Sequence, residues 1–145
     1  MLPLFDRIKI FSSFWFILGC YFTIPYFVYS VDTPNWFYYI DSMIPFISWM
    51  IIPYYIYYLV VLLPPFIWTN EWKIRNITAI LNFLSIICYI IFILWPIDAS
   101  HILRQALVKE DSVLFFFHNL ITYDFLHQNA FPSMHVVVSS FLCLC

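Results

Sequence analysis

The chain has 145 residues, of which 64% are hydrophobic, 23% are aromatic and 10% are charged, and its mean hydropathy is +0.89. A soluble domain carries charge on about a quarter of its residues, so this composition excludes an ordinary soluble protein. The net charge of −2 also excludes the strongly basic surface that a nucleic-acid partner requires. The sequence therefore predicts an all-α integral membrane domain whose surface is solvated by lipid.

The first predicted crossing covers residues 10–30, which carry no formal charge. A helix needs about 20 apolar residues to cross about 30 Å of hydrocarbon, so this run is long enough. Pro25 lies inside the run and predicts a kink, which membrane helices tolerate.

The second and third predicted crossings cover residues 48–68 and 77–97. The second follows an interfacial or re-entrant segment at about residues 41–47, and Pro64-Pro65 mark the end of its helix. The third is closed by Trp95-Pro96. Both runs are uncharged, so each is expected to span the bilayer.

The last apolar run, residues 132–145, predicts the start of a fourth crossing. From Val136 onward it supplies about 15 Å of helix, which is half of the hydrocarbon thickness. A helix that stops there leaves carbonyl groups unpaired in hydrocarbon, at a cost of several kcal/mol. We therefore expect a truncated chain, with a partner or a missing C-terminal half covering residues 136–145.

The basic residues predict the orientation of these crossings. Arg7 and Lys9 precede the first predicted crossing, and Lys73 and Arg75 lie between the second and the third. These two segments are expected to face the cytoplasm. The outer segment, residues 98–131, carries two basic residues, so the positive-inside rule places the N-terminus in the cytoplasm. The expected location is a plasma or inner membrane. Within the outer segment, residues 99–110 and 112–127 are expected to be helices that lie against the membrane surface.

Residues 129–135, Asn-Ala-Phe-Pro-Ser-Met-His, are the candidate for a functional site. Pro132 suits the first turn of a helix, whose backbone N–H groups carry the positive end of the helix dipole. Ser133 adds a hydroxyl donor, and His135 can carry a proton near neutral pH. One interpretation is a phosphate-binding site with an acid beside it. The other is a plain helix N-cap at Ser133 with an interfacial histidine.

Residues 131–136, Phe-Pro-Ser-Met-His-Val, resemble the second signature of the type 2 phosphatidic acid phosphatase and vanadium haloperoxidase superfamily, P-S-G-H. The bulky third residue of the signature resembles the inositolphosphotransferase-like branch. Residues 41–49 with Pro53-Tyr54, and residues 89–96, resemble that branch at the start of its second span and the end of its third. The resemblance implies that residues 1–145 are the N-terminal part of a six-helix phosphatase-type bundle.

The resemblance also implies roles for individual residues. Members of this superfamily cleave phosphate esters through a phosphohistidine, so His135 corresponds to the general acid and Ser133 to a ligand of the phosphoryl oxygens. Arg104 is the candidate phosphate ligand from the first signature, K-x6-R-P, although Gln105 follows it here. The third signature, S-R-x5-H-x3-D, supplies the nucleophile in the family and does not occur in residues 1–145.

No metal site and no cofactor are predicted. The four histidines are separated by 17, 9 and 8 residues, spacings that match no compact ligand motif: His101, His118, His127 and His135. Related phosphatases are metal-independent as a rule.

The expected function is that of a membrane-bound lipid phosphate phosphatase or phosphotransferase, with membrane lipids around it and a phosphorylated lipid as substrate. Without the third signature, the chain is expected to be inactive by itself, because covalent phosphoryl transfer has no first step without its nucleophile. The alternative is a small non-catalytic membrane protein or a decayed remnant of an enzyme.

The topology can be tested by labelling. In a chain without its native cysteines, Ser112→Cys is expected to react with an impermeant maleimide added to the outer side, because the orientation places residues 98–131 there. Labelling from the cytoplasmic side alone would refute this topology.

Overall fold

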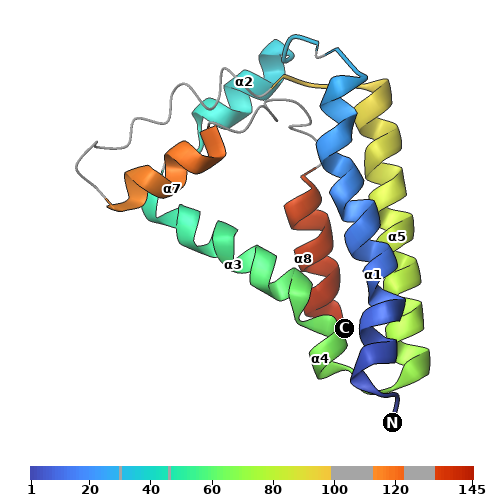
Figure 1. Ribbon diagram of the computed structural model, residues 1–145. Helices are drawn as coiled ribbons and strands as arrows, with labels where there is room; N and C mark the ends of the chain where they lie inside the picture. Colours follow the sequence, from blue (N-terminus) through green and yellow to red (C-terminus); the bar gives the residue numbers. More distant parts are fainter. Residues whose placement is uncertain (30, 46, 99–112, 123–132) are drawn as a thin grey trace.

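The computed structural model describes residues 1–29, 31–45, 47–98, 113–122 and 133–145. Every regular element in these ranges is helical, apart from one isolated bridge between Val31 and Ile97, so the predicted all-α class is confirmed for the described part. Helices α1 (Leu4–Cys20) and α5 (Glu71–Leu94) lie side by side along their length (Figure 1).

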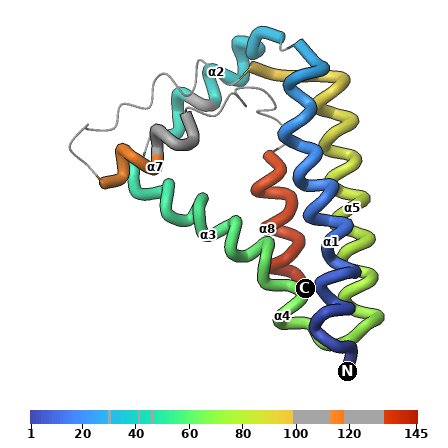
Figure 2. The backbone as a smooth tube through the Cα atoms, in the orientation of Figure 1, coloured from blue at the N-terminus to red at the C-terminus, as the bar shows by residue number. Residues whose placement is uncertain are grey.

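The elements between α1 and α5 are shorter. They are η1 (Tyr21–Tyr26), α2 (Asn35–Ser42), η2 (Ser48–Met50), α3 (Ile51–Leu62) and α4 (Pro64–Ile67). Prolines lie at two of the points where one helix gives way to the next. Pro25 lies inside η1, where a tighter 3-10 helix continues α1, and a proline pair begins α4 directly after α3. Viewed as a tube, α3 diverges from the α1–α5 pair (Figure 2).

Within the described residues, two helices are long and apolar enough to cross a membrane: Leu4–Tyr26, which is α1 with η1, and Glu71–Leu94, which is α5. They match the first and third predicted crossings, although each begins six residues earlier than expected. The apolar helices over Ser48–Leu62 and Met134–Leu144 are shorter than a full crossing. A second and a fourth crossing therefore stay predictions.

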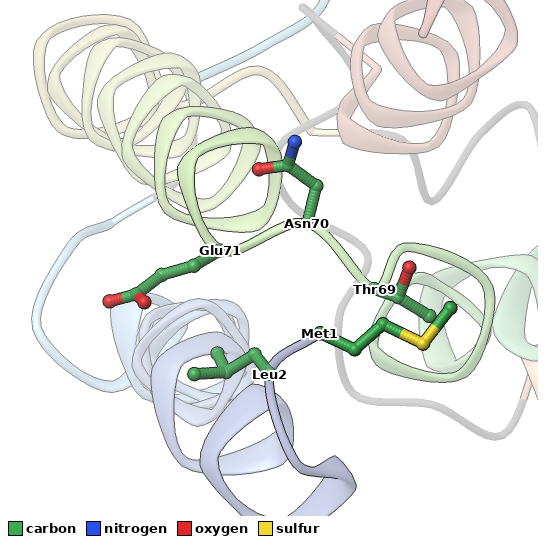
Figure 3. Close-up of a pocket in the computed structure, with 5 residues that line it drawn as sticks. All are labelled: Met1, Leu2, Thr69, Asn70 and Glu71. Atoms are coloured by element: carbon green, nitrogen blue, oxygen red, sulfur yellow. The ribbon is translucent and has the colours of Figure 1, made fainter.

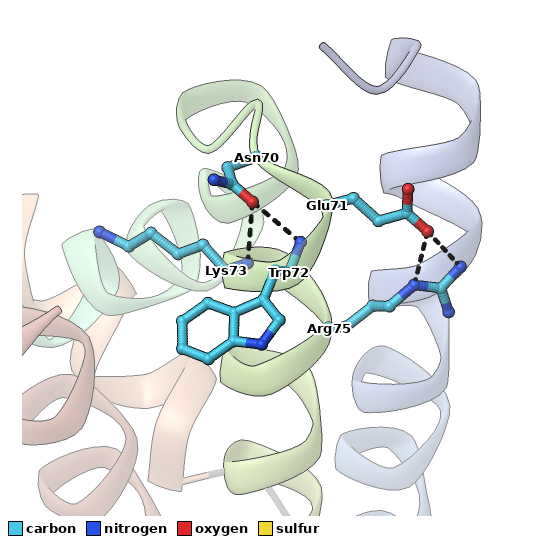
Figure 4. A network of polar contacts seen from close by, with 5 residues as sticks. All are labelled: Asn70, Glu71, Trp72, Lys73 and Arg75. Carbon is cyan, nitrogen blue, oxygen red and sulfur yellow. Dashed lines mark hydrogen bonds and ion pairs between the residues drawn. The ribbon is translucent and has the colours of Figure 1, made fainter.

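The early start of α5 has a local cause. The side-chain oxygen of Asn70 accepts hydrogen bonds from the backbone N–H groups of Trp72, at 2.9 Å, and Lys73, at 3.3 Å (Figure 4). Glu71 in the first turn pairs with Arg75 one turn later at 2.9 Å. An acidic side chain favours a helix N-terminus, and an i,i+4 ion pair adds to this, so polar residues extend α5 beyond its apolar run.

The core lies between α1 and α5. Phe11 and Phe14 of α1 and Leu81 and Phe92 of α5 are all fully buried. The Tyr89 hydroxyl donates a hydrogen bond of 2.7 Å to the backbone carbonyl of Ile17 in α1. Helices in lipid associate through close packing and interhelical hydrogen bonds, and this pair has both.

Helix α3 is tied to α1 by the Trp15 indole N–H, which donates to the Val61 carbonyl at 3.1 Å. Beyond the end of α5, the Val31 N–H donates to the Pro96 carbonyl at 2.8 Å, and the Asp98 N–H donates to the Val31 carbonyl at 3.0 Å. These bonds join the chain that leads into α2 to the chain that follows α5. At the other end of the α1–α5 pair, the Leu2 N–H donates to the Thr69 carbonyl at 3.1 Å.

Two helices complete the described chain: α7 (Val113–Thr122) and α8 (Met134–Leu144). Helix α7 lies within the predicted surface helix over residues 112–127 and contacts α3, because the Tyr55 hydroxyl donates to the Phe117 carbonyl at 3.0 Å. The predicted helix over residues 99–110 lies outside the described residues.

The contribution of the α1–α5 hydrogen bond can be measured. Tyr89→Phe is expected to lower the free energy of unfolding in mixed micelles by about 0.6–1 kcal/mol, because the carbonyl it bonds loses its tyrosine donor. Tyr29→Phe is the matched control, since Tyr29 is 94% exposed. Equal stability of the two variants would contradict the assignment.

Candidate functional site

The first turn of α8 carries the serine and the histidine of the phosphatase-like motif. Ser133 is the N-cap, with extended backbone, and its hydroxyl oxygen accepts from the Val136 N–H at 3.5 Å. The Val137 N–H donates to the Ser133 carbonyl at 3.0 Å. The N–H groups of Met134 and His135 have no carbonyl to bond within α8, because they belong to its first turn. The predicted N-cap at Ser133 is therefore confirmed.

Capping does not use up the Ser133 hydroxyl. A serine hydroxyl has one donor and two acceptor lone pairs, and the bond from the Val136 N–H takes one lone pair. The hydroxyl hydrogen remains able to donate to an anionic oxygen. The two interpretations of Ser133, as a cap and as a phosphate ligand, are therefore compatible.

The imidazole of His135 is half-buried among three tyrosine rings of α3. Its centroid lies 4.4 Å from the Tyr54 ring, 4.5 Å from the Tyr57 ring and 5.9 Å from the Tyr58 ring. These tyrosines are spaced i, i+3 and i+4, which puts them on one face of the helix. We call these three residues the tyrosine pocket.

Apolar packing holds α8 in this position. Met134 is 5% exposed and Val138 is fully buried, and both belong to the same buried cluster as Phe11 and Leu81 of the α1–α5 pair. Helix α8 contacts both α3 and α5. Burial of these two side chains therefore orients α8, and His135, next to Met134, contacts α3.

The depth of the motif differs from the expectation. The Lys73 ammonium, in the first turn of α5, donates to the Cys145 carbonyl at 2.7 Å, so α8 ends beside the start of α5. Eleven residues of helix cover roughly 16 Å. Helix α8 therefore begins beside the middle of α5, as Figure 1 shows, and not beside the C-terminal end of α5.

A polar contact holds the residue that follows α8. The Cys145 carbonyl accepts from the Lys73 ammonium, and the same ammonium lies 5.2 Å from the centroid of the Trp68 ring. The expected fourth crossing over residues 132–145 stays a prediction.

A further pocket opens near the start of α5 (Figure 3). It is lined by Met1, Leu2, Thr69, Asn70 and Glu71. None of these residues belongs to α3 or α8, so this pocket and the His135 surroundings are built from different elements.

Of the predicted site residues, the structure places Ser133 and His135 together on the first turn of α8. Arg104 lies outside the described residues, as do His101 and His127, and the His118 side chain is not described. Among the described residues, no group of three histidine, cysteine or acidic side chains is placed to hold a metal ion.

Sequence reasoning missed the tyrosine pocket. The available signal was the run Tyr54-Tyr55-Ile56-Tyr57-Tyr58, whose spacing predicts an aromatic face on a helix. Which helix this face meets depends on the packing of α3 against α8, which the spacing does not contain.

Comparison of the chain with protein-family models, with curated proteins and with solved structures gives no match. The residues at the start of α8, and the side chains around them, therefore carry the functional proposal.

The cap at Ser133 leads to a direct prediction. Ser133→Ala is expected to destabilise the first turn of α8 by about 1 kcal/mol, because the Val136 N–H loses its acceptor. Hydrogen exchange at the Val136 amide should then be roughly fivefold faster, whereas Ser140→Ala, an exposed position later in α8, should leave that rate unchanged. Equal rates in both variants would show that the hydroxyl is not the cap.

Proposed function

We propose that the chain is a member of the type 2 phosphatidic acid phosphatase superfamily and binds the phosphate of a phosphorylated lipid at the start of α8. The observation that carries the proposal is the Phe-Pro-Ser-Met-His motif, whose serine caps α8 and whose histidine is half-buried beside it. An ionisable side chain within a bundle of apolar helices is costly, and such residues commonly mark substrate sites.

Phosphate binding follows from the donors of this turn. The N–H groups of Met134 and His135 and the Ser133 hydroxyl can all donate, and the helix dipole adds partial positive charge. In an apolar environment an unpaired N–H costs free energy, and phosphoryl oxygens would satisfy it. Arg104 is proposed as a further phosphate ligand.

His135 is proposed as the general acid. In a complete site, phosphorus forms a bond to the nucleophile of the third signature while its P–O bond to the alcohol breaks. The leaving oxygen takes both electrons of the broken bond and accepts a proton from the imidazolium, which becomes neutral. Such proton transfer contributes about 10²–10⁴-fold to a rate. The attacking nucleophile of the family comes from the third signature, which residues 1–145 do not contain. We therefore propose that these residues bind the substrate with little or no turnover.

The proposal includes a topology. Helices α1 with η1, α3 with α4, and α5 are proposed to cross the bilayer, and α8 is proposed as part of a fourth crossing within a six-helix bundle. The N-terminus lies on the cytoplasmic side. Because α8 begins beside the middle of α5, the lipid phosphate has to reach a site below the outer end of that helix.

Two variants of one residue separate phosphate binding from capping. Ser133→Asp keeps a good N-cap but places a negative charge beside the phosphate, and Ser133→Thr keeps both the cap and the hydroxyl. The affinity for dioctanoyl phosphatidic acid in micelles is expected to fall at least about tenfold in Ser133→Asp and to stay near the parent value in Ser133→Thr. Dioctanoylglycerol, which lacks the phosphate, is the ligand control.

Equal affinity of the parent chain and Ser133→Asp would show that Ser133 only caps the helix. That result would favour the alternative, a small non-catalytic membrane protein. Hydrolysis of phosphatidic acid by residues 1–145, with loss of the activity in His135→Gln, would instead overturn the proposed lack of turnover.

A further inference from the structure

We propose that the tyrosine pocket positions the His135 imidazole, so that Tyr54 and Tyr57 are positioning residues for the proton donor. The acid role of His135 rests on the proposed function, whereas the positioning itself stands on the geometry alone. In the structure, three rings from one face of α3 surround a histidine that lies about 80 residues later in the chain.

The geometry restricts the imidazole in more than one direction. The Tyr54 ring is tilted by 32° to the imidazole plane, the Tyr57 ring by 54° and the Tyr58 ring by 86°. The first approaches a stacked arrangement and the last is edge-to-face, and both are favoured contacts between rings. Because the three planes differ, rotation of the imidazole would disturb at least one contact.

The same rings affect the charge that an acid must carry. Burial in apolar surroundings disfavours a positive imidazolium. The face of a tyrosine ring attracts a cation within about 6 Å of its centroid, and the Tyr54 ring, at 4.4 Å and 32° to the imidazole plane, lies close to face-on to His135. The pocket therefore offsets part of the cost of holding a charged proton donor away from water.

Tyr57 shows that the ring, and not the hydroxyl, makes this contact. Tyr57 is 7% exposed, and its hydroxyl has no hydrogen-bond partner among the described residues. A buried hydroxyl without a partner costs free energy, so Tyr57→Phe keeps the ring and is expected to leave the fold at least as stable. Tyr57→Phe therefore preserves the pocket, and leucine variants remove one ring each.

The test uses the full chain in micelles with isotope-labelled histidine, and His135→Gln identifies the His135 signals. Ring currents from the pocket are expected to shift the His135 ring protons upfield of their values in the denatured chain. Tyr54→Leu and Tyr57→Leu should each remove part of this shift, and Tyr54→Phe and Tyr57→Phe should restore it. If buried Tyr57→Leu does not fold, the half-buried Tyr54 position carries the test.

Tyr55→Leu is the matched control. Tyr55 lies on the same helix, and its ring contacts Phe117 of α7 at 5.3 Å and the Tyr54 and Tyr58 rings at 6.2 Å. Its loss is therefore expected to change the His135 shift less than the loss of Tyr54 does. A Tyr54→Leu chain with the parent shift, or a Tyr55→Leu chain that changes as much as Tyr54→Leu, would overturn the positioning role.

The outcomes also separate this inference from the proposed function. If the His135 signals respond as expected while the chain does not bind phosphatidic acid, the pocket stands and the phosphatase proposal fails. If phosphatidic acid binds and the leucine variants keep the parent signals, the phosphatase proposal stands and the positioning role fails.

Discussion

Phe11 and Phe14 of α1 lie fully buried against α5, where Leu81 and Phe92 are fully buried in turn. Close packing of these side chains stabilises the pair through many dispersion contacts. The hydrogen bond from the Tyr89 hydroxyl to α1 adds a directional contact. Helix α8 packs on α5, and α3 contacts α8 and accepts a hydrogen bond from Trp15 of α1, so the position of the candidate site depends on this pair.

A second constraint is that polar groups in apolar surroundings need partners. Both ends of α8 meet it locally, with the Ser133 hydroxyl at the start and the Lys73 ammonium at the Cys145 carbonyl. Because Lys73 lies in the first turn of α5, this bond brings the chain after α8 beside the start of α5. The first turn of α8, with His135, lies roughly 16 Å further along α5.

Much of the helical structure could be predicted from residue patterns. The uncharged runs correctly indicated the helices that became α1 with η1 and α5. Pro25, where a kink was expected, lies inside the 3-10 helix η1. The boundaries were less accurate, because an Asn70 cap and a Glu71–Arg75 pair extend α5 through charged residues. A pattern search that counts apolar residues does not register such polar contributions.

The sequence by itself determined the all-helical class, the apolar surface and the serine cap of α8, because each depends on composition or on residues within one turn. Only the tertiary structure decided that His135 meets Tyr54, Tyr57 and Tyr58, and that α8 begins beside the middle of α5. These contacts join residues more than seventy positions apart. They depend on how α3 and α8 pack around the α1–α5 pair, and helical periodicity within either segment carries no information about that packing.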